Sequence, residues 1–199
     1  MPMQMAEVTI TGIAPLLTNN PQTVDRFNPL AKAMARINAK KTRRTDDDFL
    51  ELRDTEMRAK SYFDEEIGLF IPATWLAAAI AQHSFSVCKV SKANIRGSVF
   101  TTETRIPLMC RDREKVESLD DIVGNPAFRH VMTLPQGQVR VVKAFPIFRD
   151  WSFKTRLEFD DKIIDPDSLE RTIEHASKYG GYGDFRPTFG RASARIENV

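Results

Sequence analysis

The residues of this chain that could transfer a proton near neutral pH are its three histidines, His83, His130 and His175. An imidazole held beside a hydroxyl group can act as a general base or a general acid. No spacing along the chain pairs any of these histidines with a second catalytic group, so a structural or surface role is the alternative for each. We therefore assign no catalytic residue from the sequence.

Thiols and carboxylates form no metal-binding pattern. Cys88 and Cys110 belong to neither a CxxC motif nor a Cys/His cluster, so neither a zinc site nor a disulfide framework is expected. The acidic run Asp46–Asp48 could hold a metal ion, but at the start of a helix such a run is typical of a cap and a solvated face. We expect reduced thiols, no metal and no cofactor.

Basic residues are nearly balanced by acidic ones, with 29 Lys and Arg, 27 Asp and Glu and a net charge of +2. Attraction to nucleic acid must therefore come from how the charges are distributed. The chain has a first basic cluster of Arg36, Lys40, Lys41, Arg43 and Arg44, and a second of Lys89, Lys92 and Arg96. Neutralising phosphates with such residues releases counterions and makes binding sensitive to salt. The alternative for the first cluster is a solvated helix whose charges are balanced by Asp46–Asp48.

A glycine-rich turn, Gly180–Gly190, precedes the last predicted strand. Glycines such as Gly181 and Gly183 let the backbone adopt positive φ and approach another backbone closely. Exposed N–H groups in this turn, flanked by Arg186 and Arg191, could hold a phosphate. The alternative, which is compatible with the first, is that the turn simply ends a helix.

Several aromatic residues lie beside positive charge in the C-terminal part of the chain. Nucleic-acid bases stack on exposed aromatic rings, at about 1–3 kcal/mol for each base and without sequence preference. Trp151 and Phe153 lie on an alternating strand, where some rings must face the core. Tyr182 and Phe185 lie in the glycine-rich turn, and we expect this pair to be exposed and to stack.

Alternation of apolar and polar residues predicts the strands. The segment 7–14 is a first strand with Val8, Ile10 and Ile13 facing inward, and the strongly alternating segment 151–159 is another. Shorter strands are expected at 69–71, 98–102, 105–110 and 191–196, with a basic loop at 89–97.

Prolines and capping residues predict two helices between these strands. Pro72 at a first helical position begins a helix that runs to about Val87. Asp165 caps a second helix, which begins at Pro166 and runs to about Lys178.

The segment 20–66 differs in composition and is expected to be a basic helical insertion. A helix is predicted from Pro29 to about Ala39, and Thr45 or Asp46 caps another helix that continues to Lys60. Because large apolar residues are sparse here, we expect the insertion to lie on the domain rather than form part of its core.

A length of 199 residues and a hydrophobic share of 42% fit one domain with a real core. The insertion 20–66 and an excursion, 111–137, with a β-hairpin around residues 135–137, interrupt it. The remaining order, strand, helix, strand, strand, helix, strand, predicts an α+β, ferredoxin-like βαββαβ (RRM-like) fold: an antiparallel sheet with two helices on one face.

No apolar run is long enough to span a bilayer, and Met1–Ala6 lacks the features of an export signal. We expect a cytoplasmic protein with no membrane partner.

Three segments together resemble a known family. The strand with Gly12–Leu17, the pair Ile71-Pro72 and the run Gly180–Arg191 are similar to the RAMP superfamily of CRISPR-associated RNA-binding proteins, and most of all to solitary RAMP-like proteins of bacteriophages and mobile elements. The resemblance covers residues 7–17, 69–103 and 138–197. It implies a glycine-rich loop between the second helix and the fourth strand of a ferredoxin-like fold. It also implies binding of single-stranded RNA or DNA, often as subunits that repeat along the strand. The chain is shorter than the CRISPR members.

The expected function is therefore non-enzymatic binding of single-stranded nucleic acid by a protein of phage or mobile-element origin in a bacterial cytoplasm. Weak sequence specificity is expected, because no helix or motif is suited to contacting base edges in a duplex groove. One alternative is a RAMP mimic that docks onto a host CRISPR complex and inhibits it. Another is a metal-independent endoribonuclease that uses His83 or His175. The choice between RNA and DNA, and between a filament and a discrete oligomer, stays open.

Overall fold

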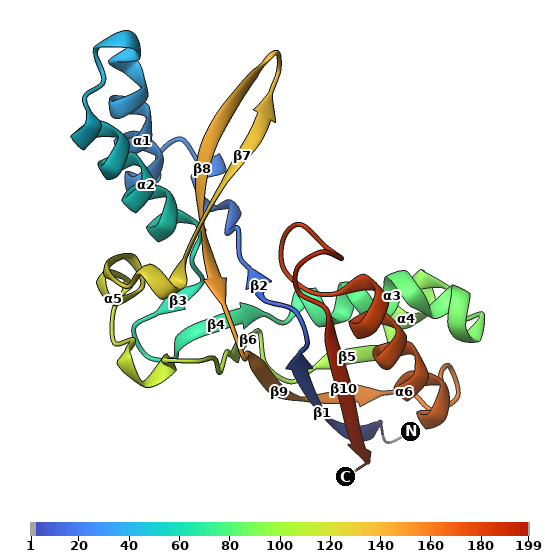
Figure 1. The fold of residues 1–199 in the computed structure, drawn as a ribbon. Helices are drawn as coiled ribbons and strands as arrows, with labels where there is room; N and C mark the ends of the chain where they lie inside the picture. Colours follow the sequence, from blue (N-terminus) through green and yellow to red (C-terminus); the bar gives the residue numbers. More distant parts are fainter. Residues whose placement is uncertain (1–2, 199) are drawn as a thin grey trace. The chain divides into compact units, whose positions relative to one another are not determined.

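The computed structural model describes residues 3–198, which form a mixed α+β protein with antiparallel sheets (Figure 1). The predicted α+β class is confirmed. The chain divides into two compact units. The first unit contains the segments up to residue 16, 69–113 and from 148 onward, and the second contains 17–68 and 114–147. The predicted insertion and most of the predicted excursion thus belong to the second unit.

The first unit contains a four-stranded antiparallel sheet. Its strands, in the order β10-β1-β9-β5, are β10 (Ala192–Asn198), β1 (Gln4–Gly12), β9 (Ser152–Phe159) and β5 (Val99–Thr101). Val8 and Ile10 are fully buried, as the alternation predicts. The expectation that Ile13 faces inward is wrong, because β1 ends at Gly12 and Ile13 is 59% exposed.

Two long helices of the first unit contact each other: α3 (Thr74–Cys88) and α6 (Pro166–His175). The cap predicted for the second helix is confirmed, since the Asp165 side chain accepts a hydrogen bond from the backbone N–H of Ser168 at 2.9 Å. The α-helical part ends at His175, earlier than predicted, and one wider turn follows, η5 (Ala176–Gly180). The glycine-rich turn then leads into β10, as expected.

The start of α3 differs from the prediction. Pro72 is the last residue of β4 (Gly68–Pro72), and it pairs with Arg105 of β6 (Arg105–Pro107). The helix begins two residues later, at Thr74. A proline is tolerated at the end of a short strand because its missing N–H leaves few ladder hydrogen bonds unmade.

The predicted basic loop at 89–97 is also wrong, because most of it forms helix α4 (Lys92–Ser98). Lys89, with φ 64°, ends α3 in the left-handed conformation. Ser91 then caps the new helix, and its hydroxyl accepts from the Asn94 N–H at 3.2 Å. A serine cap satisfies one of the N–H groups that a helix start leaves free, which is enough to begin a short helix here.

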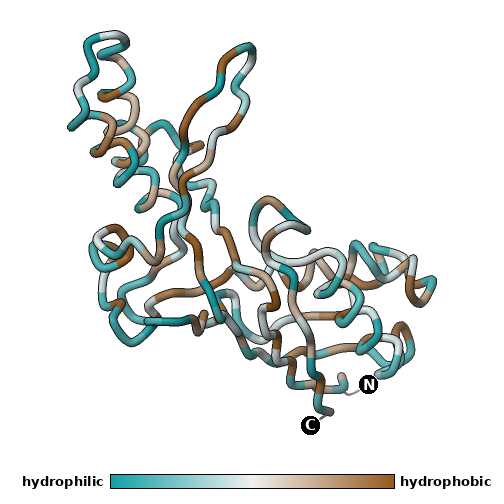
Figure 2. Tube along the Cα trace, viewed as in Figure 1, coloured by the Kyte–Doolittle hydropathy of each residue, from teal (hydrophilic) through white to brown (hydrophobic). Residues whose placement is uncertain are grey.

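The second unit contains a helix pair, α1 (Pro29–Ala39) and α2 (Asp46–Lys60), and the prediction of both helices is confirmed. Figure 2 shows hydrophilic and hydrophobic positions mixed along this pair. Two apolar side chains of the pair are fully buried, since Ile37 and Met57 are 0% exposed. Ile122 and Phe128, from beyond residue 114, are buried in the same unit. The second unit therefore has a small core of its own.

A β-hairpin is the other long element of the second unit. It joins β7 (Arg129–Gln136) to β8 (Val139–Phe148), with Gly137 at φ 62° in the turn, so the predicted hairpin is confirmed. Val131, Val139 and Val142 are 42%, 62% and 47% exposed on its two strands.

The short elements are β2 (Leu16–Leu17), η1 (Pro21–Val24), η2 (Lys41–Arg43), β3 (Phe63–Asp64), η3 (Arg113–Lys115), α5 (Leu119–Gly124) and η4 (Pro126–Phe128). Within residues 3–198, no helix has both the length and the apolar character that a membrane crossing requires.

Candidate nucleic-acid interface

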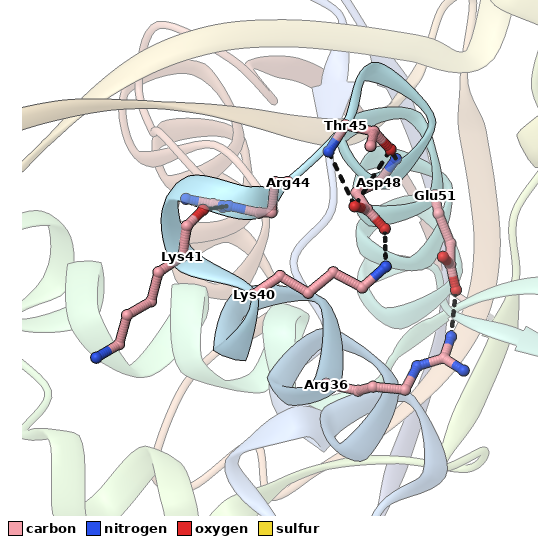
Figure 3. Close-up of polar contacts among 7 residues, drawn as sticks. All are labelled: Arg36, Lys40, Lys41, Arg44, Thr45, Asp48 and Glu51. Carbon is pink, nitrogen blue, oxygen red and sulfur yellow. Dashed lines mark hydrogen bonds and ion pairs between the residues drawn. The ribbon is translucent and has the colours of Figure 1, made fainter.

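Part of the first basic cluster is neutralised by α2 (Figure 3). The Lys40 ammonium group pairs with Asp48, and the Arg36 guanidinium group pairs with Glu51 at 2.5 Å. Asp48 also closes the helix cap by accepting from the Thr45 N–H at 2.9 Å. The bond from Lys40, followed by the bond from Thr45, holds the pKa of the Asp48 carboxyl group below its usual value. Lys40 is therefore balanced by the acidic run Asp46–Asp48, as the alternative predicted, whereas Arg36 is balanced by Glu51 outside that run.

The other three residues of the first basic cluster keep their charge uncompensated. Arg44 donates to two neutral oxygens, the Lys41 carbonyl at 3.0 Å and the Asn38 side chain at 3.2 Å. Its guanidinium group lies 5.0 Å from the centre of the Phe49 ring. Lys41 and Arg43 are exposed and have no ion-pair partner among residues 3–198. In Figure 3 the Lys41 side chain extends away from the other contacts.

A cavity of about 720 Å³ in the second unit is lined in part by basic side chains that the sequence analysis did not single out. Residues of α1, its exit and α2 line one part, and residues of the hairpin β7–β8 line the other. Its charged lining residues are Arg44, Arg53, Glu56, Arg140 and Lys143. Phe49, which is 44% exposed, is the aromatic residue of the lining. The spacing of Phe49, Arg53 and Glu56 along α2 was the signal in the sequence, because residues four and three apart share a helix face.

Glu56 joins α2 to the hairpin at the base of this cavity. It is 1% exposed, and its carboxylate accepts from the Lys143 ammonium group at 2.6 Å and the Ala144 N–H at 2.8 Å. Lys60 lies 3.7 Å from the same carboxylate, and its ammonium group is 3.7 Å from the centre of the Phe145 ring. The buried negative charge is thus shared by two lysines and one backbone donor, and it keeps Lys143 at the cavity.

The glycine-rich turn uses several of its own amides internally. The N–H of Gly181 donates to Ala176 O, that of Tyr182 to Gly190 O, and that of Gly190 to Pro15 O, each at 2.8 Å. Gly190 has φ 74°, and a Cβ there would lie 1.8 Å from the Tyr182 carbonyl oxygen, so only glycine fits. The expectation of a run of free N–H groups is therefore wrong for these three residues.

Tyr182 is not the exposed stacking residue that was expected. It is 1% exposed, and its hydroxyl group hydrogen-bonds the Ser177 hydroxyl at 2.8 Å. Its ring meets Trp151 and Phe153 edge-on, at centroid distances of 6.1 and 5.4 Å. Burial raises the pKa of the phenol. Phe185 is half-buried, so of the expected pair only Phe185 keeps a partly exposed ring.

A second cavity, of about 480 Å³, lies beside the glycine-rich turn in the first unit. Gln82, His83, Tyr179, Asp184, Phe185 and the exposed Arg186 line it, together with Gly180, Gly183 and Pro187. Gly180 is in direct contact with the imidazole, because a Cβ on it would lie 2.5 Å from His83 Nε2. Arg191, the other arginine of the turn, is exposed but does not line this cavity.

The structure pairs two histidines that the sequence left separate. His83 Nδ1 lies 3.2 Å from His175 Nδ1, although the two residues are 92 positions apart. Burial, followed by the positive charges of His175, Arg186 and Lys92, lowers the pKa of His83 below its ordinary value of 6.5. His83 is therefore neutral at pH 7.

The second basic cluster is exposed. Lys89 ends α3, and Lys92 and Arg96 lie on α4. The Lys89 ammonium group lies 5.6 Å from the centre of the Phe85 ring, and Phe85 is 60% exposed. A solvent-facing aromatic ring beside cations is the arrangement expected for base stacking, and the sequence analysis did not single out Phe85.

No protein-family model matches the chain, and the comparison with curated proteins found no match. What the chain does must therefore be argued from the cations, rings and cavities described above.

Proposed function

We propose that this chain binds single-stranded nucleic acid and belongs to the RAMP-like proteins of phages and mobile elements. The order β10-β1-β9-β5, with α3 between β1 and β5 in the chain and α6 between β9 and β10, supports the ferredoxin-like part of the proposal. In that fold a split βαβ arrangement produces this strand order. The glycine-rich turn between η5 and β10 occupies the place that the family resemblance implies.

The observation that carries the function is the set of cations without counter-charges in the second unit. Arg53 and Arg140 line the larger cavity and, like Lys41 and Arg43, have no ion-pair partner within residues 3–198. Holding like charges together without an anion is unfavourable, and phosphate groups relieve the repulsion. Arg44 and Phe49 add a planar cation and an exposed ring, which suit bases.

The exposed face of the four-stranded sheet is a poorer candidate. Its charges largely neutralise one another, as in the pairs Lys154–Glu7 at 2.5 Å and Arg195–Glu197 at 2.8 Å. Among the described residues of its four strands, Phe100 is the one exposed aromatic residue. A sheet that binds single strands normally carries stacking rings on this face, so we place the strand on the cation-rich surfaces instead.

The test is equilibrium binding of labelled single-stranded RNA and DNA at a series of salt concentrations. If about four Lys or Arg side chains each neutralise one phosphate, the logarithm of the affinity falls against the logarithm of salt with a slope of about −3. Duplex DNA of the same length is the control and is expected to bind more weakly. An affinity for both single strands that stays flat as salt rises would refute the proposal.

RNA cleavage without a metal is a second candidate, favoured by the His83–His175 contact. A hydrogen bond between two Nδ1 atoms requires one imidazole to donate and the other to accept. Neutral His83 could take the proton of a ribose 2′-hydroxyl group as that oxygen attacks the adjacent phosphorus. The 5′-oxygen would leave with a proton donated by water, and a 2′,3′-cyclic phosphate would remain. Arg186 is available in the same cavity for the phosphate charge.

We expect wild-type protein to cleave single-stranded RNA, but not DNA, in the presence of a chelator. The rate should fall as the pH drops through the lowered pKa of His83, below about 6.5, because protonation removes the base. His83→Ala should abolish cleavage, whereas His130→Ala, which changes a histidine outside this cavity, should not. RNA that stays intact while it is bound would eliminate this candidate and leave the binding proposal unaffected.

A further inference from the structure

The larger cavity of the second unit has the dimensions and the charge of a ligand site. Its volume of about 720 Å³ lies within the range of about 300–1,000 Å³ that is typical of small-molecule sites. Four cationic side chains line it, and its one lining carboxylate, Glu56, is buried and already engaged by Lys143 and the Ala144 N–H. The lining therefore presents a surplus of positive charge that no residue of the cavity neutralises.

Two arginines that line this cavity without a counter-charge among residues 3–198 come from different elements of the second unit. Arg53 lies on α2 and Arg140 on β8, 87 positions apart by residue number, and neither has an ion-pair partner in the described part of the chain. A guanidinium group presents paired N–H donors that match two oxygens of one phosphate. Two such groups in the lining of one cavity are suited to one phosphodiester, whereas a single exposed arginine is not a site.

The ring of Phe49 provides a flat apolar surface in the same cavity. Phe49 is 44% exposed, and the Arg44 guanidinium group lies 5.0 Å from its ring centre. Aromatic rings and guanidinium planes both stack with bases. An acidic peptide would use the arginines but would have no need of this apolar surface, so the combination favours a nucleotide.

We propose that the cavity between α2 and the hairpin β7–β8 holds one nucleotide of a bound single strand, with its phosphate on Arg53 and Arg140 and its base on Phe49. This inference rests on the proposed function and specifies where it takes place. None of these three residues belongs to the basic clusters or to the glycine-rich turn.

The experiment compares the affinities of variants for a labelled single strand, after thermal melting has verified that each variant is folded. Arg53→Ala and Arg140→Ala should each weaken binding by about tenfold or more and should each make the salt slope shallower by about 0.7. Phe49→Ala should weaken binding by about 5- to 150-fold without changing that slope. Arg140 is exposed on the hairpin, so its variant remains informative even if Arg53→Ala fails to fold.

Arg36→Ala is the matched control, because it removes an arginine of the same unit that Glu51 already neutralises. It should change the affinity by about twofold or less. A strand carrying a photoreactive uracil should crosslink to the peptide that contains Phe49 in wild-type protein.

The results of these measurements distinguish failure of the proposed nucleotide site from failure of the proposed single-strand binding. If wild-type protein binds neither RNA nor DNA, the proposed function and this inference both fail. If the wild type binds and the Arg53, Arg140 and Phe49 variants bind equally well, the cavity is refuted while the function stands. Competition by a poly-glutamate peptide, with no effect of Phe49→Ala, would instead indicate an acidic peptide ligand. A free nucleoside monophosphate that binds as tightly as the strand would indicate a mononucleotide site, and either of these results overturns the proposal.

Discussion

Replacing Glu56 by alanine is expected to destabilise the second unit by about 3–5 kcal/mol. The carboxylate is 1% exposed and is shared by Lys143, Lys60 and the Ala144 N–H. Its removal leaves two lysines beside each other without the charge that holds them and leaves one backbone donor unpaired. Urea denaturation measures the loss, and amide hydrogen exchange along α2 and β8 should show that it is local.

Glu51→Ala is the control for this prediction, because it removes another glutamate from the same helix. Its pair with Arg36 is solvent-exposed, with side-chain exposures of 69% for Arg36 and 46% for Glu51. Exposed pairs contribute about 0–1 kcal/mol, so this variant should melt close to the wild type. Equal stability of the two variants would mean that the Glu56 contacts do not hold α2 to the hairpin.

Replacing Tyr182 by alanine is expected to cost about 3–5 kcal/mol of stability in the first unit. The ring is 1% exposed and packs edge-on against Trp151 and Phe153, so truncation leaves a cavity in the core. Tyr182→Phe should cost less, about 1–3 kcal/mol, because it keeps the ring but leaves the buried Ser177 hydroxyl group without its partner.

Tyr179→Ala is the matched control, since Tyr179 lies close by and is 58% exposed. Its loss should change stability by about 0.5 kcal/mol or less. If Tyr182→Ala instead left stability intact and weakened strand binding, Tyr182 would be the exposed stacking residue that the sequence suggested, and the packing described here would be incorrect.

The starts of α1, α2 and α6 and the regular strands were predictable because their causes are local. The caps at Thr45 and Asp165 need only a side chain and an N–H three residues later. The strand β9 needs only alternation, and its inward residues Phe153, Leu157 and Phe159 are each 1% exposed. Irregular segments were less predictable, as α4 shows, because a basic composition is compatible with both a loop and a short helix.

Which aromatic side chains of the glycine-rich turn are buried could not be derived from its composition. Aromatic residues in a turn have no periodicity that separates buried from exposed positions, so Tyr182 and Phe185 could not be distinguished. The tertiary structure distinguishes them, because the backbone of Tyr182 pairs with Gly190 while its ring enters the core beside Trp151.

By itself, the sequence determined the α+β class, most of the strands and helices, and the positions of the basic clusters, since each of these follows from neighbours within a few residues. Only the tertiary structure decided which charges remain free. It pairs Arg36 and Lys40 with acids of the next helix, brings Arg53 and Arg140 into the lining of one cavity, and places His83 against His175. These contacts join residues far apart in the chain, and their chemistry exists only once the backbone has brought them together.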